Sequence, residues 1–185
     1  MKSNRPIYKF SFLLLITVLL SVKYCVAQYS EYEIKAAYIF NFAKFIDWPA
    51  NSNHIKDTIV LGVYKNDPFG IVLEKTMLGR KVNGKEWKIV RVSRTSDLIK
   101  CNIAFFSNLS KSEIINVLEK LKNYPVLTIG DEIPGFCESG GMINFTPQFS
   151  QHQFEINNDE ASHHQIVISP KLLLLAKIIT TEDEF

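Results

Sequence analysis

Short apolar runs alternate with segments that carry helix-capping residues along most of this 185-residue chain. This alternation restricts the fold more than any other feature. The run at 58–64 is continuously apolar, which is typical of a central strand covered on both faces. Further strands are predicted at 87–92, 102–107 and 125–129. Because helices are expected between them, the pattern predicts an α/β fold with one largely parallel sheet of about six strands and helices on both faces.

Two of the intervening helices have recognisable starts. Asp67 and Pro68 provide an N-cap and a proline at the first helical position, so a helix is expected from there to about Met77. Ser110 caps a second helix. Its apolar positions are Ile114, Ile115, Val117, Leu118 and Leu121.

An earlier helix begins at a capping box, in which the Ser30 hydroxyl and the Glu33 carboxylate each satisfy a free backbone N–H. We expect this helix to run to Trp48, because the residue before Pro49 is disfavoured in helical conformation. Its apolar face is predicted to contain Ile34, Ala37, Tyr38, Phe42 and Phe45. Further apolar positions widen that face, so burial on most sides is expected.

The second half of the chain contains the most distinctive stretch, at 136–157. Gly140 and Gly141 permit a tight turn or a close chain approach before the apolar residues at 142–145. Alternating residues at 154–156 predict a strand that forms a hairpin with, or neighbours, the preceding one.

The chain is expected to close with a strand at 166–168 and a helix that starts at Pro170. The residues of this helix are apolar nearly all round, which predicts that it docks into the core. The apolar residues are Leu172, Leu173, Leu174, Leu175, Ala176, Ile178 and Ile179.

Residues 1–27 have the three parts of a secretion signal: a basic start, an apolar run at 10–22 and small residues ending at Ala27. Cleavage before Gln28 would leave residues 28–185 as one domain. An uncleaved anchor is the weaker alternative, because the apolar run has 13 residues and a membrane span needs about 20.

The charge of the chain depends on this signal. Four of the 21 basic residues and none of the 19 acidic residues lie in it, so the exported part has 17 basic and 19 acidic groups and a net charge of −2. Nothing in this balance favours nucleic acid as a partner.

The motifs provide no catalytic, cofactor-binding or metal-ligating set. No histidine pair has the His-Glu-x-x-His spacing, Gly-x-Ser-x-Gly is absent, and the first strand is not followed by Gly-x-Gly-x-x-Gly. We therefore predict no enzyme, no cofactor and no metal site. The histidines are expected at the surface, and they are His54, His152, His163 and His164.

Loops beyond the carboxyl ends of the strands are the general place where open α/β sheets bind ligands or partners. In this chain such loops are expected at 65–67, 108–110, 131–132 and 148–152. The residues that we single out as partner- or ligand-facing are Lys65, Asn66, Phe149 and His152.

Cys25 leaves with the signal, so Cys101 and Cys137 are the cysteines of the exported chain. A disulfide between them would close a loop of about 36 residues and stabilise the fold by roughly 3–4 kcal/mol. The alternative is two buried thiols that lie apart, since sequence spacing does not give the Cα distance that a bridge requires.

Several short motifs together resemble the YfiR family of exported bacterial proteins. They begin with the helix at 31–49, which contains Tyr-x-x-Lys-Ala-Ala-Tyr, and they follow in the family's order over nearly the whole exported chain. The other motifs are Leu61-Gly62, 67–70, 140–145, 154–157, and Ser169 with 171–173. Within this signature, Gly140, Gly141, Asn144 and Asn157 are interpreted as structural residues.

The resemblance implies a periplasmic regulator without enzymatic activity. It implies that the partner is a membrane-bound diguanylate cyclase, which the regulator holds inactive, and that an outer-membrane lipoprotein sequesters the regulator. Release of the cyclase would then raise cyclic-di-GMP and promote biofilm formation. Relatives also occur beside other sensors, including histidine kinases.

The family is also linked to homodimers and to disulfide-dependent stability. Cys101 and Cys137 lack the near partners that would make two separate bridges, so redox control does not follow from the resemblance. The competing hypothesis for function is a periplasmic module that binds a small ligand at its strand-end loops and feeds a sensor histidine kinase or a transport system.

Overall fold

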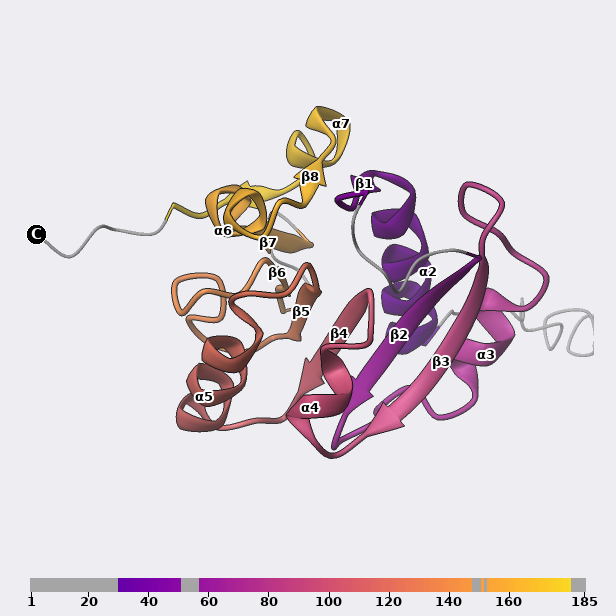
Figure 1. Cartoon of the computed structure of the whole chain (residues 1–185), viewed down its shortest axis with the longest axis horizontal. Coiled ribbons are helices and arrows are strands. Elements are labelled where there is room, and N and C mark those ends of the chain that lie inside the picture. The colour runs from indigo at the N-terminus through magenta and orange to yellow at the C-terminus, as the bar shows by residue number, and fades with distance from the viewer. Residues whose placement is uncertain (1–29, 51–56, 148–150, 152, 181–185) are drawn as a thin grey trace, which may run out of the picture.

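A seven-stranded sheet with helices on both faces forms the centre of the molecule (Figure 1). The computed structural model describes residues 30–50, 57–147, 151 and 153–180. The strands of the sheet lie in the order β3-β2-β4-β5-β6-β7-β9. They are β2 (Thr58–Tyr64), β3 (Glu86–Val92), β4 (Ile103–Ser107), β5 (Leu127–Asp131), β6 (Ile143–Phe145), β7 (Phe154–Ile156) and β9 (Lys177–Ile178). The predicted α/β class is confirmed.

The sheet is parallel from β3 to β6. The strand β7 pairs antiparallel with β6, so these two strands form the neighbouring pair expected from the sequence. The last strand, β9, runs parallel to β7 at the edge of the sheet. The central position of β2, between β3 and β4, explains why its sequence is apolar on both faces.

Helices cover the two faces of the sheet in separate layers (Figure 1). One face is covered by α2 (Glu31–Lys44) and α3 (Val72–Met77), and the other by α4 (Thr95–Leu98) and α5 (Lys111–Leu121). The core accordingly consists of two clusters, one containing Phe42 and Phe105 and one containing Phe106 and Phe136. Among the described helices, none is long and apolar enough to cross a membrane.

The remaining elements gather at one end of the molecule. They are β1 (Ile46–Asp47), α6 (Asn158–His163), β8 (Val167–Ile168) and α7 (Pro170–Leu173). The strands β1 and β8 form a small antiparallel sheet of their own. The strand expected at 166–168 therefore exists, but it joins β1 and not the main sheet.

The start of α2 was predicted correctly, its end was not, and its buried face was predicted only in part. The Ser30–Glu33 capping box is present. The helix stops at Lys44, because Ile46 and Asp47 leave it to pair with β8. Its buried residues are Lys35, Ala36, Ile39, Phe42 and Ala43. Ile34, which was expected in the core, is 44% exposed.

The helix expected to start at Pro68 starts later, at Val72. The Asp67 carboxylate accepts hydrogen bonds from the backbone N–H groups of Phe69 and Gly70, and Gly70 has a φ of +54°. A left-handed residue interrupts a helix, so this segment forms a turn before α3. By contrast, Ser110 caps α5 as predicted, and Glu113 completes a capping box there.

The closing helix is shorter and more exposed than predicted. It ends at Leu173, and the side chains of Leu174 and Leu175 are 84% and 62% exposed. The reason is that Lys177 and Ile178 leave the helical path and join the sheet as β9. A pairing partner that lies far away in the sequence thus overrides the local apolar pattern.

The two glycines of the distinctive stretch have different roles. Gly140 has a φ of +93°, which favours glycine. Gly141 has no such φ, but a Cβ atom there would lie 2.2 Å from the ring of Phe136, which is fully buried. Gly141 is therefore required for the close approach of the backbone before β6 to the Phe136 ring.

Candidate functional site

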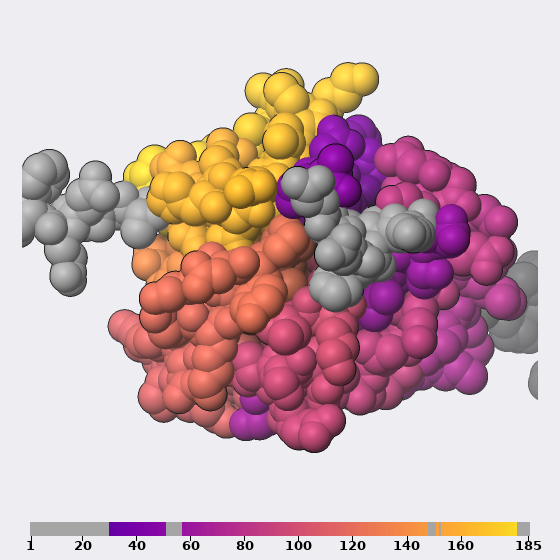
Figure 2. Space-filling model, in the orientation of Figure 1, coloured from indigo at the N-terminus to yellow at the C-terminus, as the bar shows by residue number. Residues whose placement is uncertain are grey.

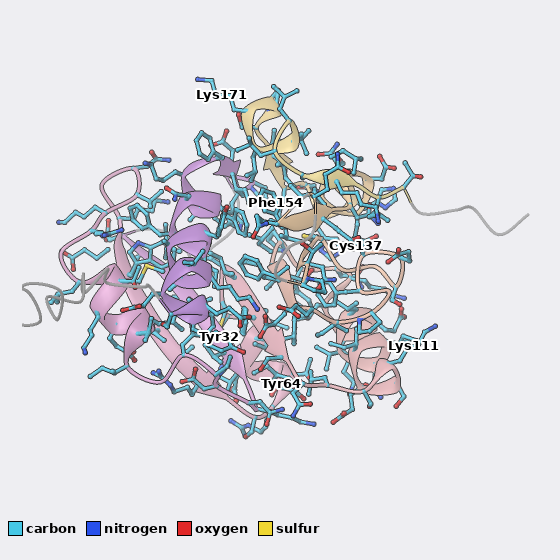
Figure 3. All side chains as sticks on the ribbon, turned by 180° about the vertical axis from the view of Figure 1, so that it is seen from behind. Tyr32, Tyr64, Lys111, Cys137, Phe154 and Lys171 are labelled. Carbon is cyan, nitrogen blue, oxygen red and sulfur yellow. The ribbon has the colours of Figure 1, made fainter. Side chains whose placement is uncertain are left out.

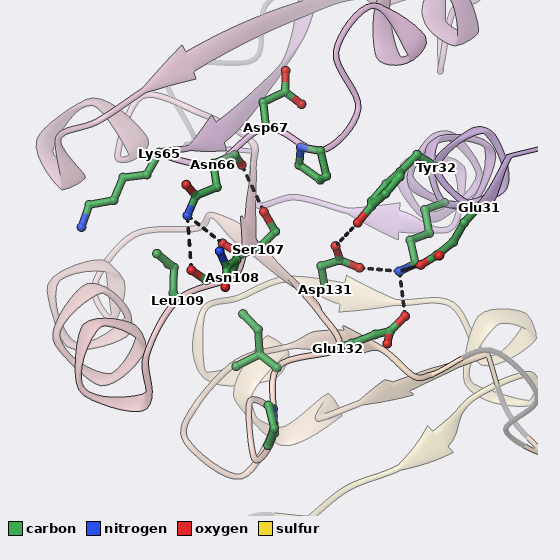
Figure 4. A pocket seen from close by; sticks show the side chains of 14 residues that line it. Glu31, Tyr32, Lys65, Asn66, Asp67, Ser107, Asn108, Leu109, Asp131 and Glu132 are labelled. Atoms are coloured by element: carbon green, nitrogen blue, oxygen red, sulfur yellow. Dashed lines mark hydrogen bonds and ion pairs between the residues drawn. The ribbon is translucent and has the colours of Figure 1, made fainter.

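A pocket of about 730 Å³ lies at the carboxyl edge of the parallel strands (Figure 4). Its walls come from the residues that follow β2, β4 and β5 and from the first turns of α2. The chain continues from β2 to β3 on one side and later returns to β4 on the other side. The pocket therefore lies at the point where the strand order reverses, which is the usual ligand position in open α/β sheets.

Each of the three strands that open into the pocket is followed directly by a residue in left-handed conformation. Lys65, Asn108 and Glu132 have φ values of 57°, 50° and 55°. This conformation costs a non-glycine residue about 1–2 kcal/mol. Strained residues of this kind concentrate at functional sites. Their common position at the pocket makes this edge the candidate functional site.

One wall of the pocket is organised around the ammonium group of Lys35. The Lys35 Nζ donates to Asp131 Oδ1 at 2.5 Å and to Glu132 Oε1 at 2.9 Å, and it also contacts Glu31. The Tyr32 hydroxyl donates to Asp131 Oδ2 at 3.3 Å. We call Glu31, Lys35, Asp131 and Glu132 the Lys35 cluster. It ties the first turns of α2 to the end of β5.

Burial and hydrogen bonding have opposite effects on the pKa values in this cluster. Burial lowers the pKa of Lys35, but hydrogen bonds to Asp131, Glu31 and Glu132 outweigh it, so the pKa lies above its ordinary value. Burial raises the pKa of Asp131, which the bonds from Lys35 and Tyr32 oppose only in part. Three carboxylates face one ammonium group, and the wall is therefore rich in hydrogen-bond acceptors.

The same three carboxylates are the one group in the described residues whose oxygen atoms are close enough together to hold a metal ion. The oxygen atoms of Glu31, Asp131 and Glu132 lie within 4.8 Å of one another. The Lys35 ammonium donates to all three of them. A lysine thus supplies the positive charge that a metal ion would otherwise bring.

The opposite wall is formed by the loops after β2 and β4. The Asn66 side chain donates to the carbonyl oxygens of Ser107 and Asn108 at 3.2 and 3.3 Å, and the Ser107 hydroxyl donates to the Asn66 carbonyl at 3.1 Å. Lys65 forms an ion pair with Glu113 at 2.8 Å. These contacts hold the two loops together beside the pocket (Figure 4).

The structure brings together some of the residues singled out from the sequence. Lys65 and Asn66 line the pocket, as do residues of the predicted loops at 108–110 and 131–132. Phe149 and His152 lie outside the described residues. Whether they face a partner or a ligand remains a prediction.

Asn144 and Asn157 lie away from the opening and brace the surrounding backbone. The Asn144 side chain accepts a hydrogen bond from the N–H of Ile133 at 3.2 Å and donates to its carbonyl at 3.0 Å. Because Ile133 lines the pocket, Asn144 supports its wall. Asn157 caps α6 through the N–H of Glu160 and donates to the carbonyl of Cys137 at 2.9 Å.

Cys101 and Cys137 are both buried free thiols. The thiol of Cys101 lies against the carbonyl of Asp97, and that of Cys137 lies against the carbonyl of Met142. Burial raises the pKa of Cys101 to about 11 and raises that of Cys137 further. Of the two alternatives, the structure has the separate thiols.

Sequence reasoning missed two ionisable residues. Lys35 was placed on a helix without a role, although its spacing of four residues from Glu31 was a signal for an ion pair. His164 was predicted at the surface and is 7% exposed. Its Nδ1 lies 2.7 Å from the carbonyl oxygen of Tyr124, and its Nε2 lies 3.0 Å from Glu160 Oε1.

Comparison with known proteins agrees with the resemblance noted in the sequence. A search of curated proteins gives no significant match. The family model described as YfiR/HmsC-like matches residues 32–177, which include Lys35, the strands β2 to β7 and the pocket loops. A match over this length, most of the chain, means that the protein belongs to the YfiR/HmsC-like family.

Proposed function

We propose that this chain is a periplasmic regulatory protein that binds the periplasmic part of a membrane signalling enzyme and represses it. Membership in the YfiR/HmsC-like family supports the regulatory role. A diguanylate cyclase is the proposed partner, with control of cyclic-di-GMP and biofilm formation as the consequence. An outer-membrane lipoprotein that sequesters the regulator is the proposed second partner.

The observation that carries this proposal is the exposure of apolar side chains in the C-terminal segment. Val167 is 62% exposed, Leu174 84%, Leu175 62% and Ile178 47%. We call these four residues the C-terminal apolar patch. The segment that carries them covers one end of the molecule beside β1 (Figure 2). Neighbouring exposed apolar residues of this kind are typical of protein interaction sites.

The position of the patch also suits a partner that contacts the backbone. The strand β9 is the last strand of the sheet, and it carries Ile178. An edge strand presents N–H and C=O groups to which an extended segment of a partner can add. Lys171 on α7 projects outward at the same end (Figure 3). Apolar contact and edge pairing together provide affinity and register for a protein partner.

Crosslinking in cells tests the proposal. The full-length chain is expressed, exported and crosslinked, and the captured membrane proteins are identified by mass spectrometry. We expect the native chain to recover a cyclase or another sensor with a periplasmic domain. Leu174→Asp combined with Leu175→Asp should lower this recovery about tenfold or more, since buried contacts at the centre of an interface dominate its affinity.

The matched control is Ile115→Asp on α5, where the native side chain is 48% exposed. Recovery of the partner should be unaffected by this change. Equal recovery with the Leu174 and Leu175 variant would remove the patch from the interface, and repeated failure to capture any sensor would count against the proposal as a whole. Crosslinked dimers of the chain itself would identify the patch as a homodimer contact.

The pocket favours a second candidate function, the binding of a small polar molecule that the regulator senses. Its acceptor-rich Lys35 cluster suits ligands with ammonium or hydroxyl groups. A ligand present at 100 times its dissociation constant adds about 2.7 kcal/mol of stability, which thermal-shift screening of polar metabolites detects. The shift should disappear in Asn66→Ala, and a hit that shifts this variant equally lies outside the pocket.

A further inference from the structure

The outer side of α3 carries apolar and basic side chains that are exposed to solvent. Ile71 is 63% exposed and Leu78 is 83% exposed, with Lys75 between them in sequence. Spacings of four and three residues place these three side chains on one side of the helix. The other side packs Leu73 and Met77 into the core. The exposed side therefore lies outside the core.

Two grooves continue this surface in opposite directions. A groove of about 670 Å³ runs between α2 and α3, and its lining includes Ile34, Lys75 and Arg80. A second groove, of about 380 Å³, extends toward β3 and includes Leu78, Arg80 and Lys81. Arg80 belongs to both grooves, so the surface is continuous. We call the set Ile71, Lys75, Leu78, Arg80 and Lys81 the α3 face.

Two of the three cations of the α3 face, Lys75 and Arg80, are available for external anions, whereas Lys81 pairs with Glu86 at 3.0 Å. Within the described residues, neither Lys75 nor Arg80 forms an ion pair with a carboxylate, and Arg80 instead lies over the ring of Phe40 at 5.2 Å. Lys44 lies over the same ring at 5.6 Å. Glu74, the nearest acid in sequence, is bound by Arg91.

Positive charge is also concentrated in the part of the chain around α3. Residues 71–88 contain five basic and two acidic residues, a net charge of +3. The rest of the 28–185 segment contains 12 basic and 17 acidic residues, a net charge of −5. A chain with an overall negative charge thus presents a locally positive, partly apolar surface.

We propose that the α3 face binds the surface of an anionic phospholipid bilayer. Basic side chains attract anionic headgroups within roughly 10 Å, while exposed apolar side chains enter the headgroup and acyl boundary. Leu78 at the end of α3 and Ile71 at its start are the inserting residues. The lipid phosphates are bound by Lys75 and Arg80.

This inference does not depend on the C-terminal apolar patch. The α3 face adjoins β3, and the patch adjoins β9, at the two opposite edges of the sheet (Figure 1). A bilayer and a protein partner could therefore be bound at the same time. Membrane contact at one edge would concentrate the regulator where its partner is anchored.

Vesicle cosedimentation tests the inference. The full-length chain is expressed, and its exported form is recovered from the periplasm. It is mixed with vesicles of phosphatidylglycerol and phosphatidylcholine, or of phosphatidylcholine alone. We expect binding to the anionic vesicles that weakens as salt rises from about 0.05 to 0.3 M, because surface charges are then screened. Each cation removed by Lys75→Gln or Arg80→Gln should weaken binding about fivefold.

Matched variants on α5 distinguish vesicle binding by the α3 face from a general effect of charge or apolar exposure on vesicle binding. Lys111→Gln with Lys120→Gln removes two exposed charges from α5, on the other side of the sheet, and should weaken binding less than twofold. Leu78→Ser should weaken binding, whereas Ile115→Ser on α5 should not. Circular dichroism of each variant verifies the fold.

Three results would overturn the inference. The first is equal binding to neutral and anionic vesicles. The second is an equal loss of vesicle binding with the α5 variants, and the third is no binding to anionic vesicles at low salt.

The lipid and protein proposals can be told apart. If the α3 variants abolish capture of a protein partner while vesicle binding persists, the α3 face is a protein interface instead. Loss of partner capture in the Leu174 and Leu175 variant leaves the lipid result unchanged, so the two proposals fail separately.

Discussion

Among single residues, Lys35 supplies the positive partner of the buried Asp131 carboxylate beside the pocket. Its side chain is 8% exposed and that of Asp131 is 6% exposed. A buried carboxylate without a positive partner is strongly unfavourable. The ammonium group is therefore a structural requirement of the pocket wall, and any ligand at the wall meets a charge pattern that Lys35 has already partly neutralised.

Replacement of this lysine should be costly. We expect Lys35→Met to lower the free energy of unfolding by about 3–5 kcal/mol, because it leaves the Asp131 charge buried without its partner. Urea denaturation at pH 7 measures the effect. Glu31→Gln should cost less than about 1 kcal/mol, since Glu31 is 46% exposed. A loss below 1 kcal/mol in Lys35→Met would show that the cluster is not a buried anchor.

Gly141 is a second residue whose role can be tested alone. Gly141→Ala should destabilise the fold by about 1–3 kcal/mol, because the added methyl group overlaps the Phe136 ring. The same substitution should cost less in a Phe136→Leu background, which a double-mutant cycle of unfolding free energies measures. Additive effects of the two substitutions would exclude a direct contact between them.

At the scale of elements, α6 is fastened to the loop before β5 through His164. Both ring nitrogens face acceptors, the carbonyl of Tyr124 and the carboxylate of Glu160. Only the doubly protonated ring can donate to both. Burial lowers the pKa of His164, but the bonds to Glu160 and Tyr124 outweigh it and hold the pKa above its ordinary value.

The consequence is a pH dependence with a definite sign. A raised pKa in the folded state means that the stabilisation is complete below about pH 6.5 and is lost as pH rises through the folded pKa. We expect the free energy of unfolding to fall between pH 6 and pH 8 by roughly 1–2 kcal/mol more in the native chain than in His164→Gln. Urea titrations at the two pH values measure this, and equal slopes would contradict it.

Elements whose limits depend on local sequence were predictable, and those that depend on distant pairing were not. The capping boxes at Ser30 and Ser110 involve residues three positions apart, so the sequence contains all the information for these helix starts. The end of α2 depends on pairing between β1 and β8, and the end of α7 depends on β9 joining β7. These partners lie more than 20 residues away.

The candidate site shows the same difference between local patterns, which were predictable, and distant contacts, which were not. The loops after β2, β4 and β5 were expected to converge, because parallel strands end at one edge of the sheet. Lys65 and Asn66 accordingly line the pocket. The contribution of Lys35 required knowledge of where α2 crosses that edge, which no local pattern contains. His164 was missed for a similar reason, since its partner Tyr124 lies 40 residues away.

At the scale of the whole molecule, the sheet separates three surfaces. The pocket lies at the carboxyl edge of the parallel strands, the α3 face adjoins β3, and the C-terminal apolar patch adjoins β9. In the proposed account, these surfaces serve a small molecule, a bilayer and a protein partner. Such a division would let a signal at one surface alter binding at another without direct contact between the ligands.

The proposed repression of a cyclase through the C-terminal apolar patch can be tested in cells by the cyclic-di-GMP content. We expect deletion of the gene to raise the cyclic-di-GMP content several-fold, and we expect the native chain and Ile115→Asp to return it to the original level. The variant with Leu174→Asp and Leu175→Asp should be exported at the same level and should not restore it. An unchanged cyclic-di-GMP content after deletion, or a full return to the original level with that variant, would contradict repression through this patch.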